Sequence, residues 1–212
     1  EAVRALWRCH YPGEHRLILI DNSSEDFEDK KWLEDNCHFY IRSYRNLGSA
    51  VAYNLGINMA RTEYVTITSD DARLVHKQWF EDTKKIIEQS GEDNVVSLSN
   101  LFLHKVAPED VYQSDKRYTL EEYAELSRKY GSGASWDFNF ACALGKKETF
   151  LKAGGFPEDT YIYAIDAEFM KEAEKNNIRT VQSGGVVFHY GDASHKGRLV
   201  EAGKYQQTGV LE

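Results

Sequence analysis

The stretch "EYVTITSDDARLVHKQWF" (63–80) places two adjacent aspartates, Asp70 and Asp71, between a strand-like run and a predicted helix. β-branched and aromatic residues dominate the run 63–68, which is typical of a buried strand. Carboxylates this close raise each other's pKa, so the pair calls for a compensating charge. A divalent cation with hard oxygen ligands, magnesium or manganese, would supply it. The alternative is that one aspartate caps the helix beginning near residue 77 while the other faces solvent.

Strands and helices alternate on the N-terminal side of this pair. "RLILI" (16–20) and "HFYIRS" (38–43) have strand character, and a helix is expected between them over 26–35. The stretch "NLGSAVAYNLGINMA" (46–60) predicts a second helix. Its expected core face carries apolar residues four apart: Leu47, Val51, Leu55 and Met59. Strand, helix and strand at this spacing predict a parallel sheet with right-handed crossovers.

The alternation continues to residue 99 and then stops. A helix is expected over 77–89 and a strand over "NVVSLS" (94–99). Residues 101–140 are polar and irregular, apart from a helix whose Thr119 and Glu122 have the spacing of a capping box. The remaining elements are expected to be strands over 140–145, 179–183 and 184–190 and a helix over 166–176.

Length and composition bound the class of protein. A chain of 212 residues with 42% hydrophobic content buries one sizeable core, so we expect a single domain over 1–212. Its first half, 1–100, has the pattern of a nucleotide-binding unit, while 101–212 leaves room for an accessory binding surface. The net charge of −8 argues against nucleic acid as a partner.

Cysteines and apolar runs suggest a compartment. Cys9, Cys37 and Cys142 are odd in number and widely spaced, which fits neither a disulfide framework nor a zinc site. They are interpreted as reduced thiols, so a cytoplasmic location is expected. The longest apolar runs are too short to cross a bilayer, so no transmembrane segment is expected.

Six short motifs follow one another along the chain. They are "DNSSED" (21–26), "RNLGSAVAYNLGI" (45–57), "TSDDA" (68–72), "KAGGFPED" (152–159), "YAIDAEFM" (163–170) and "FHYGDAS" (188–194). In order and spacing they resemble the family-2 glycosyltransferases of the GT-A fold, over about residues 3–195. The resemblance implies an α/β fold with a Rossmann-like, mostly parallel sheet and a mixed C-terminal half. The family's first strand, one wall of the base pocket, has no counterpart, because residues 1–12 have the pattern of the helix after it.

The resemblance assigns a nucleotide site to the first half and an acceptor site to the second. Asp21 matches the aspartate that contacts the nucleotide base. Asn46 and Gly48 lie in the stretch that precedes the helix under the nucleotide. Asp70 is assigned to the same nucleotide site. The implied donor is a nucleotide-diphosphate sugar, and the implied acceptor is a glycan or another hydroxyl compound.

A metal site is implied at the acidic motif. Asp71 best fits the family's metal-binding position, with Asp70 the alternative, and Ser69 replaces the first acidic or amide residue of the motif. His189 matches the histidine that joins the metal site. The imidazole shifts the expected cofactor from Mg²⁺ toward Mn²⁺. The structural alternative for His189 is a strand-end histidine bonded to a backbone carbonyl.

Asp166 matches the family's catalytic base, although Ile165 replaces the preceding glutamate. Attack by a hydroxyl opposite the leaving group requires a carboxylate to remove its proton, and the transfer would invert the anomeric configuration. The alternative role of Asp166 is a helix N-cap, which is compatible with catalysis. Glu168 is the next candidate if Asp166 faces away.

Residues near the middle of the chain have a composition suited to sugars. Trp136 and Asp137, with Phe138 and Asn139, combine aromatic surface with hydrogen-bonding groups, so they are candidates for the acceptor or donor-sugar pocket. Core packing is the alternative, since aromatic side chains bury large areas.

The leading interpretation is an inverting, metal-dependent glycosyltransferase. The main alternative is a non-catalytic module of the same fold that binds a nucleotide sugar or glycan. A phosphate-receiver domain is a third reading, but it would place the acidic pair after the first strand of a shorter chain.

Overall fold

A computed structural model describes most of the chain between residues 15 and 189. The described residues are 3–4, 15–24, 29–74, 78–90, 93–103, 119, 121–122, 125, 128–129, 131–135, 138–160 and 164–189. The helices are α2 (Lys30–Asp35), α3 (Ser49–Met59), α4 (Trp79–Ser90), α7 (Lys147–Lys152) and α8 (Ile165–Lys175). The strands are β1 (Ile18–Asp21), β2 (Phe39–Arg42), β3 (Tyr64–Thr68), β4 (Ala72–Leu74), β5 (Asn94–Leu103), β6 (Gly131–Ser135), β7 (Cys142–Lys146) and β8 (Arg179–His189).

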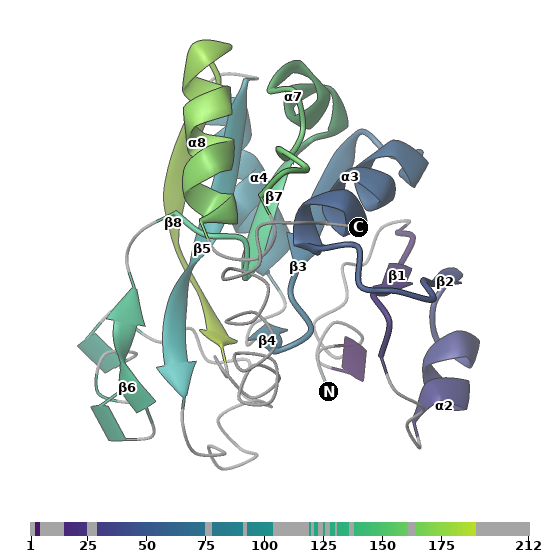
Figure 1. Cartoon of the computed structure of the whole chain (residues 1–212). Coiled ribbons are helices and arrows are strands. Elements are labelled where there is room, and N and C mark those ends of the chain that lie inside the picture. Colours follow the sequence, from purple (N-terminus) through teal and green to yellow (C-terminus); the bar gives the residue numbers. More distant parts are fainter. Residues whose placement is uncertain are drawn as a thin grey trace, which may run out of the picture.

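The strands form two sheets, as Figure 1 shows. β1 and β2 pair in parallel, and the larger sheet has the order β3-β7-β5-β8-β4, with β6 on β5. The α/β class is confirmed, but the expectation of a mostly parallel sheet is wrong for the larger one. Among the strands that the structure describes in that sheet, only β5 and β8 run parallel, and the other pairings are antiparallel. The alternation along the chain predicted the strands and helices but not the pairing of the strands. β3 pairs with β7, which lies in the second half of the chain.

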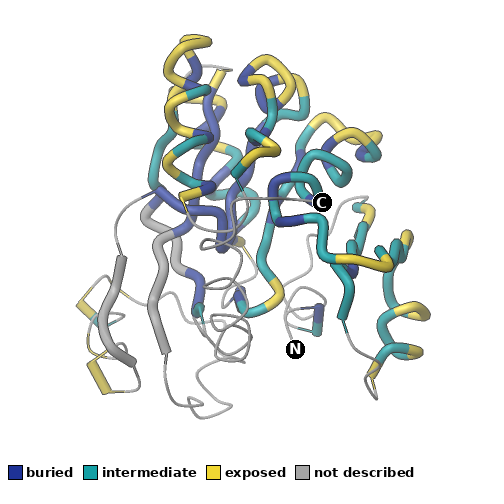
Figure 2. Tube along the Cα trace, in the orientation of Figure 1, coloured by how far each residue is buried: buried dark blue, intermediate teal, exposed yellow. Residues whose placement is uncertain are grey.

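The larger sheet separates two packed layers because alternate residues of β5 face opposite sides. Val95 belongs to a core cluster with Phe169 of α8, and Val96 to a cluster with Ile87 of α4. In Figure 2 the central strands are accordingly the most buried part of the described chain. The two strands expected over 179–190 are one strand, β8, whose pairing with β5 is irregular between Ser97 and Ser99.

An aromatic cluster forms the core on the α8 side. Its rings come from Phe138, Phe140, Phe150, Phe156 and Phe169. Phe140 lies 4.6 Å from Phe156 and 4.9 Å from Phe169, both edge-on, measured between ring centroids. These are favoured aromatic geometries, and they fix the loop before β7 against α8.

Helix α3 buries a different face from the one expected. The predicted residues Leu47, Val51, Leu55 and Met59 are only partly buried. Ala50 and Ile57, which are 1% exposed, turn to the core instead, with Tyr53 packed against it. Because the helix is apolar nearly all round, its sequence does not select one face.

The glycine pair of "KAGGFPED" has a structural role against α3. Gly154 and Gly155 both adopt positive φ, at +92° and +73°. A Cβ on Gly155 would lie 2.7 Å from Oδ1 of Asn54. Asn54 accepts a hydrogen bond from the N–H of Phe156 at 2.8 Å and donates one to its carbonyl at 2.9 Å. This reciprocal pair attaches the turn to the helix.

Other local predictions have mixed outcomes. Thr119 and Glu122 exchange both hydrogen bonds of the capping box, which confirms it. Residues 5–14 lie outside the described chain, so the helix expected over 1–12 is untested beyond its residues 3–4, which are helical. Cys37 and Cys142 carry free thiols. No helix among the described residues combines the length and the apolar character needed to span a bilayer.

Candidate active site

The two adjacent aspartates occupy a tight turn between β3 and β4. The N–H of Ala72 donates to the carbonyl of Ser69 at 3.3 Å, which places Asp70 and Asp71 at the two central positions. Asp70 is exposed, whereas Asp71 is partly buried. The turn therefore places one carboxylate in solvent and the other in a partly buried position. A strand, β4, follows directly, so the interpretation of the pair as the cap of a following helix is wrong.

Asp71 and His189 meet because β4 pairs with the end of β8. The register places Ala72 opposite His189, and Nε2 of His189 lies 3.0 Å from Oδ1 of Asp71. Burial would raise the pKa of Asp71, but the hydrogen bond and charge of His189, with a smaller effect of Ser69, hold that pKa below its ordinary value. Asp71 is thus an anion at neutral pH. Nε2 of His189 thus contacts a carboxylate.

Asp166 lies in the first turn of α8 but does not cap it. The N-cap is Ala164, at φ 68°, and Asp166 Oδ1 instead accepts the N–H of Phe140 at 3.0 Å. The N-cap alternative is therefore wrong. Burial raises the pKa of Asp166, and the Phe140 hydrogen bond and the charge of His189 offset this only in part. A carboxylate with a raised pKa is a better proton acceptor than an ordinary one.

The segment before β7 connects the two carboxylates. Phe140 holds Asp166 through its N–H, and the next residue, Ala141, accepts the N–H of Ser69 at 3.1 Å through its carbonyl. The hydroxyl of Thr68 also donates to this carbonyl, at 3.0 Å. Adjacent backbone groups therefore fix Asp166 and the acidic turn relative to each other. Neither backbone contact has a sequence signal, so the sequence did not indicate Phe140 or Ala141.

The donor set beside the acidic turn fits a divalent cation. Asp71 supplies an ionised carboxylate and His189 an imidazole, a combination suited to manganese. The hydroxyl oxygen of Ser69 is buried without a hydrogen-bond partner of good geometry. No cluster of three His, Cys, Asp or Glu residues occurs among the described residues. Asp71 and His189 are thus the described side chains that would hold a divalent cation beside this turn.

Asp21, the residue predicted to contact the nucleotide base, is 6% exposed and is surrounded by hydrogen-bond donors. Its Oδ2 accepts the hydroxyl of Tyr40 at 2.6 Å, and its Oδ1 accepts the N–H of Ser24 at 2.8 Å. Arg42, its register partner on β2, approaches to 3.5 Å. Burial would raise the pKa of Asp21, but these hydrogen bonds and the Arg42 charge lower it overall. The sequence did not indicate Tyr40 or Arg42, because strand register brings them there.

Asn46 orders the loop before α3. Its Oδ1 accepts the side-chain amide of Asn22 and the N–H of Gly48, both at 2.9 Å. Asn22 in turn accepts the N–H of Leu47 at 2.7 Å. Gly48 is buried at φ 82°, a conformation that favours glycine. Asn46 and Gly48, two of the four predicted nucleotide residues, thus lie in one loop beside the end of β1.

Of the predicted sugar-side residues, the structure describes Glu168 but not the other two. Trp136 and Asp137 lie outside the described residues. Phe138 belongs to the aromatic core, and Asn139 is buried with its amide bonded to Leu98 and Ala141. For these two residues the core-packing alternative is correct. The carboxylate of Glu168 forms an ion pair with Lys171 on α8.

Comparison with known protein families gives a match over most of the chain. The profile of the family described as Glycosyl transferase family 2 matches residues 1–151. The chain belongs to glycosyl transferase family 2. A search of curated proteins gave no match.

Solved structures of glycosyltransferases share the fold of this family member. A mannosyltransferase from Pyrobaculum calidifontis, in complex with GDP-Man and Mn²⁺, is 19% identical, with a TM-score of 0.59 over 100% of this chain and 61% of its own. Residues 1–349 of S. aureus TarS are 15% identical, with a TM-score of 0.60 over 100% of this chain and 62% of their own. GalNAc-T7, with UDP, GalNAc and Mn²⁺, is 12% identical, with a TM-score of 0.55 over 81% of this chain and 36% of its own. The chain thus spans about three fifths of the first of these relatives.

Proposed function

We propose that this domain transfers a sugar from a nucleotide-diphosphate donor to a hydroxyl acceptor, with inversion of the anomeric centre. Asp71 and His189 would hold Mn²⁺ or Mg²⁺, and Asp166 acts as general base. Family membership and the fold shared with proteins solved with GDP-Man or UDP and Mn²⁺ support the class of donor. A glycan or another hydroxyl compound is the expected acceptor.

One observation carries the proposal: backbone groups of adjacent residues fix Asp166 and the turn that holds Asp71. The acceptor hydroxyl loses its proton to Asp166 while its oxygen bonds to the anomeric carbon. The bond from that carbon to the diphosphate breaks, and the electron pair leaves with the diphosphate oxygen. A bound cation would supply positive charge to this leaving group. Attack and departure on opposite sides of the carbon produce inversion.

The proposal is tested by nucleoside diphosphate release from a panel of nucleotide sugars with MnCl₂. We expect release by the wild type, and a loss of about 100-fold or more in Asp71→Asn, since one carboxylate supplies several kcal/mol of cation-dependent stabilisation. Asp93→Asn is the matched control, because Asp93 pairs with Lys152 on the surface. Release that persists in EDTA, or equal rates in the three proteins, would refute the metal-dependent reaction.

Two departures from the family motifs favour a second candidate, a binding module without turnover. Ser69 replaces the first acidic or amide residue of the acidic motif, and Ile165 replaces the glutamate before Asp166. Such a module would be stabilised against heat by a nucleotide sugar with Mn²⁺, because a ligand of the native state raises apparent stability. It would release no diphosphate in the same samples.

A further inference from the structure

Tyr53 approaches the site from α3 and is not assigned by the proposed reaction. Its ring centroid lies 5.1 Å from that of Phe156 and 6.2 Å from that of Phe140. Phe140 is the residue whose N–H holds Asp166 at 3.0 Å. Packing between rings thus fixes the Tyr53 side chain beside the segment that positions the proposed base.

The hydroxyl of Tyr53 has no hydrogen-bond partner among the described residues. The side chain is partly buried and packs against the core cluster on the α8 side. Burial raises its pKa, and the negative charges of Asp166, Asp70 and Asp71 raise it further. The phenol therefore stays neutral and keeps its proton to donate. The phenol is thus influenced by the charge of Asp166 and by the charges of Asp70 and Asp71 in the acidic turn.

A ligand with phosphate oxygens needs donors in this region. When ionised, Asp70, Asp71 and Asp166 can accept hydrogen bonds but cannot donate them. Their negative charges also repel an entering diphosphate. A cation held at Asp71 would offset part of this repulsion. A neutral hydroxyl fixed by aromatic packing adds a donor without another charge, and its ring position makes the ordering cost small.

We propose that the Tyr53 hydroxyl donates a hydrogen bond to a non-bridging oxygen of the donor's diphosphate, on the side facing Asp166. The proposal rests on the proposed function, since it requires a nucleoside diphosphate in this site. Tyr53 is then a further binding residue, one that recognises the phosphate rather than the base or the acceptor.

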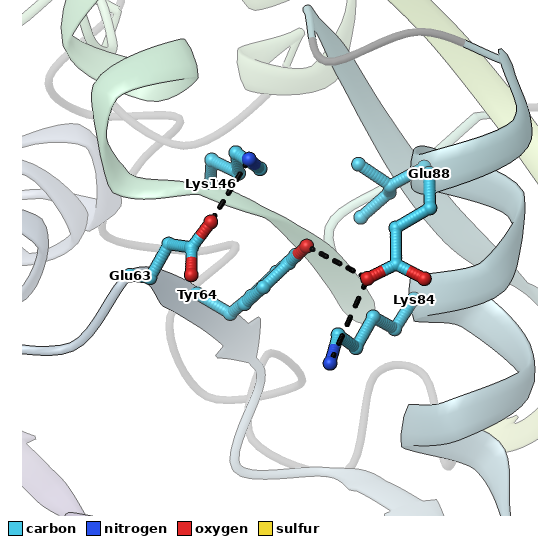
Figure 3. A pocket seen from close by; sticks show the side chains of 6 residues that line it. Glu63, Tyr64, Lys84, Glu88 and Lys146 are labelled. Carbon is cyan, nitrogen blue, oxygen red and sulfur yellow. Dashed lines mark hydrogen bonds and ion pairs between the residues drawn. The ribbon is translucent and has the colours of Figure 1, made fainter.

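The test compares Tyr53→Phe with the wild type by calorimetric titration of ADP, CDP, GDP, UDP and dTDP in MnCl₂. Phenylalanine keeps the ring packing and removes only the hydroxyl. Tyr64→Phe is the matched control at the opposite end of β3 from the acidic turn. Its hydroxyl contacts Glu88 at 3.5 Å in a surface hollow lined by Lys84 and Lys146 (Figure 3).

We expect Tyr53→Phe to weaken the bound diphosphate by about 10- to 100-fold, the effect of one hydrogen bond to a charged group. The parent nucleoside should bind equally to both proteins, and Tyr64→Phe should behave as the wild type. Equal diphosphate affinity in Tyr53→Phe, or an effect confined to acceptor kinetics, overturns the inference alone. A wild type that binds none of the five diphosphates overturns the proposed function together with it. Failure of Tyr53→Phe to fold would show a structural role for the hydroxyl and also overturn the inference.

Discussion

Replacement of Asp166 by asparagine separates catalysis from stability. Asp166 accepts the N–H of Phe140 through Oδ1, and the amide oxygen of asparagine can accept the same hydrogen bond. Because burial raises the pKa of Asp166, its ionised form lowers the stability of the fold above that pKa. A neutral asparagine removes this cost. We therefore expect Asp166→Asn to unfold at a temperature no lower than the wild type near pH 7.

The catalytic activity of Asp166→Asn, unlike its stability, should fall. A positioned general base contributes about 10²- to 10⁴-fold in rate, equivalent to about 3–5 kcal/mol of transition-state stabilisation. We expect kcat of Asp166→Asn to fall by about that factor, with the affinity for nucleoside diphosphate unchanged. The wild-type rate should fall with decreasing pH through the pKa of Asp166, which is raised above its ordinary value of 3.8, because only the ionised form accepts a proton.

The assay is steady-state release of nucleoside diphosphate from pH 4 to 8, with thermal unfolding of the same samples. A variant that keeps more than about a tenth of the wild-type kcat would refute the assignment of Asp166 as general base, since the expected loss is at least about 100-fold. A variant that unfolds well below the wild type would show instead that the carboxylate stabilises the fold, and the reasoning from burial would be wrong.

Two further predictions concern stability. Asn54→Ala leaves the partly buried N–H and C=O of Phe156 unsatisfied, at about 1–3 kcal/mol each, so unfolding in urea should show a loss of about 2–6 kcal/mol. Asn58→Ala, which removes a bond only to a carbonyl of its own helix, should lose clearly less, and equal losses would contradict the role of the turn. Because the folded pKa of Asp71 is lowered, its ionised form stabilises the fold above the unfolded value of 3.8, and this contribution disappears as pH falls through the folded pKa. The stability difference between wild type and Asp71→Asn should therefore shrink below pH 4 in urea titrations, and a constant difference would contradict the sign.

Local patterns predicted the elements better than their packing. The capping box of Thr119 and Glu122 forms as its spacing indicates, because both partners lie within four residues. The core face of α3 was predicted wrongly, since its apolar residues surround the helix and Ala50 rather than Val51 turns inward. Local propensity is a property of neighbours in the chain, whereas the choice of face depends on what packs against it.

The site divides in the same way. Order and spacing of motifs indicated Asp71, Asp166 and His189, because the chemistry restricts which side chains can serve. The motifs did not indicate Tyr53, whose proposed role depends on ring packing against Phe140. They also did not indicate Phe140, whose backbone N–H donates to Asp166.

By itself, the sequence determined the α/β class, the approximate places of most strands and helices, and the family to which the chain belongs. Tertiary structure alone decided that β3 pairs with β7 and that the larger sheet is mixed. It also decided that one aspartate of the adjacent pair turns outward while its neighbour meets His189. The physical reason is that strand pairing joins residues far apart in the chain, 74–82 positions in β3–β7 and 113–117 in β4–β8, and no local pattern records which strands will pair.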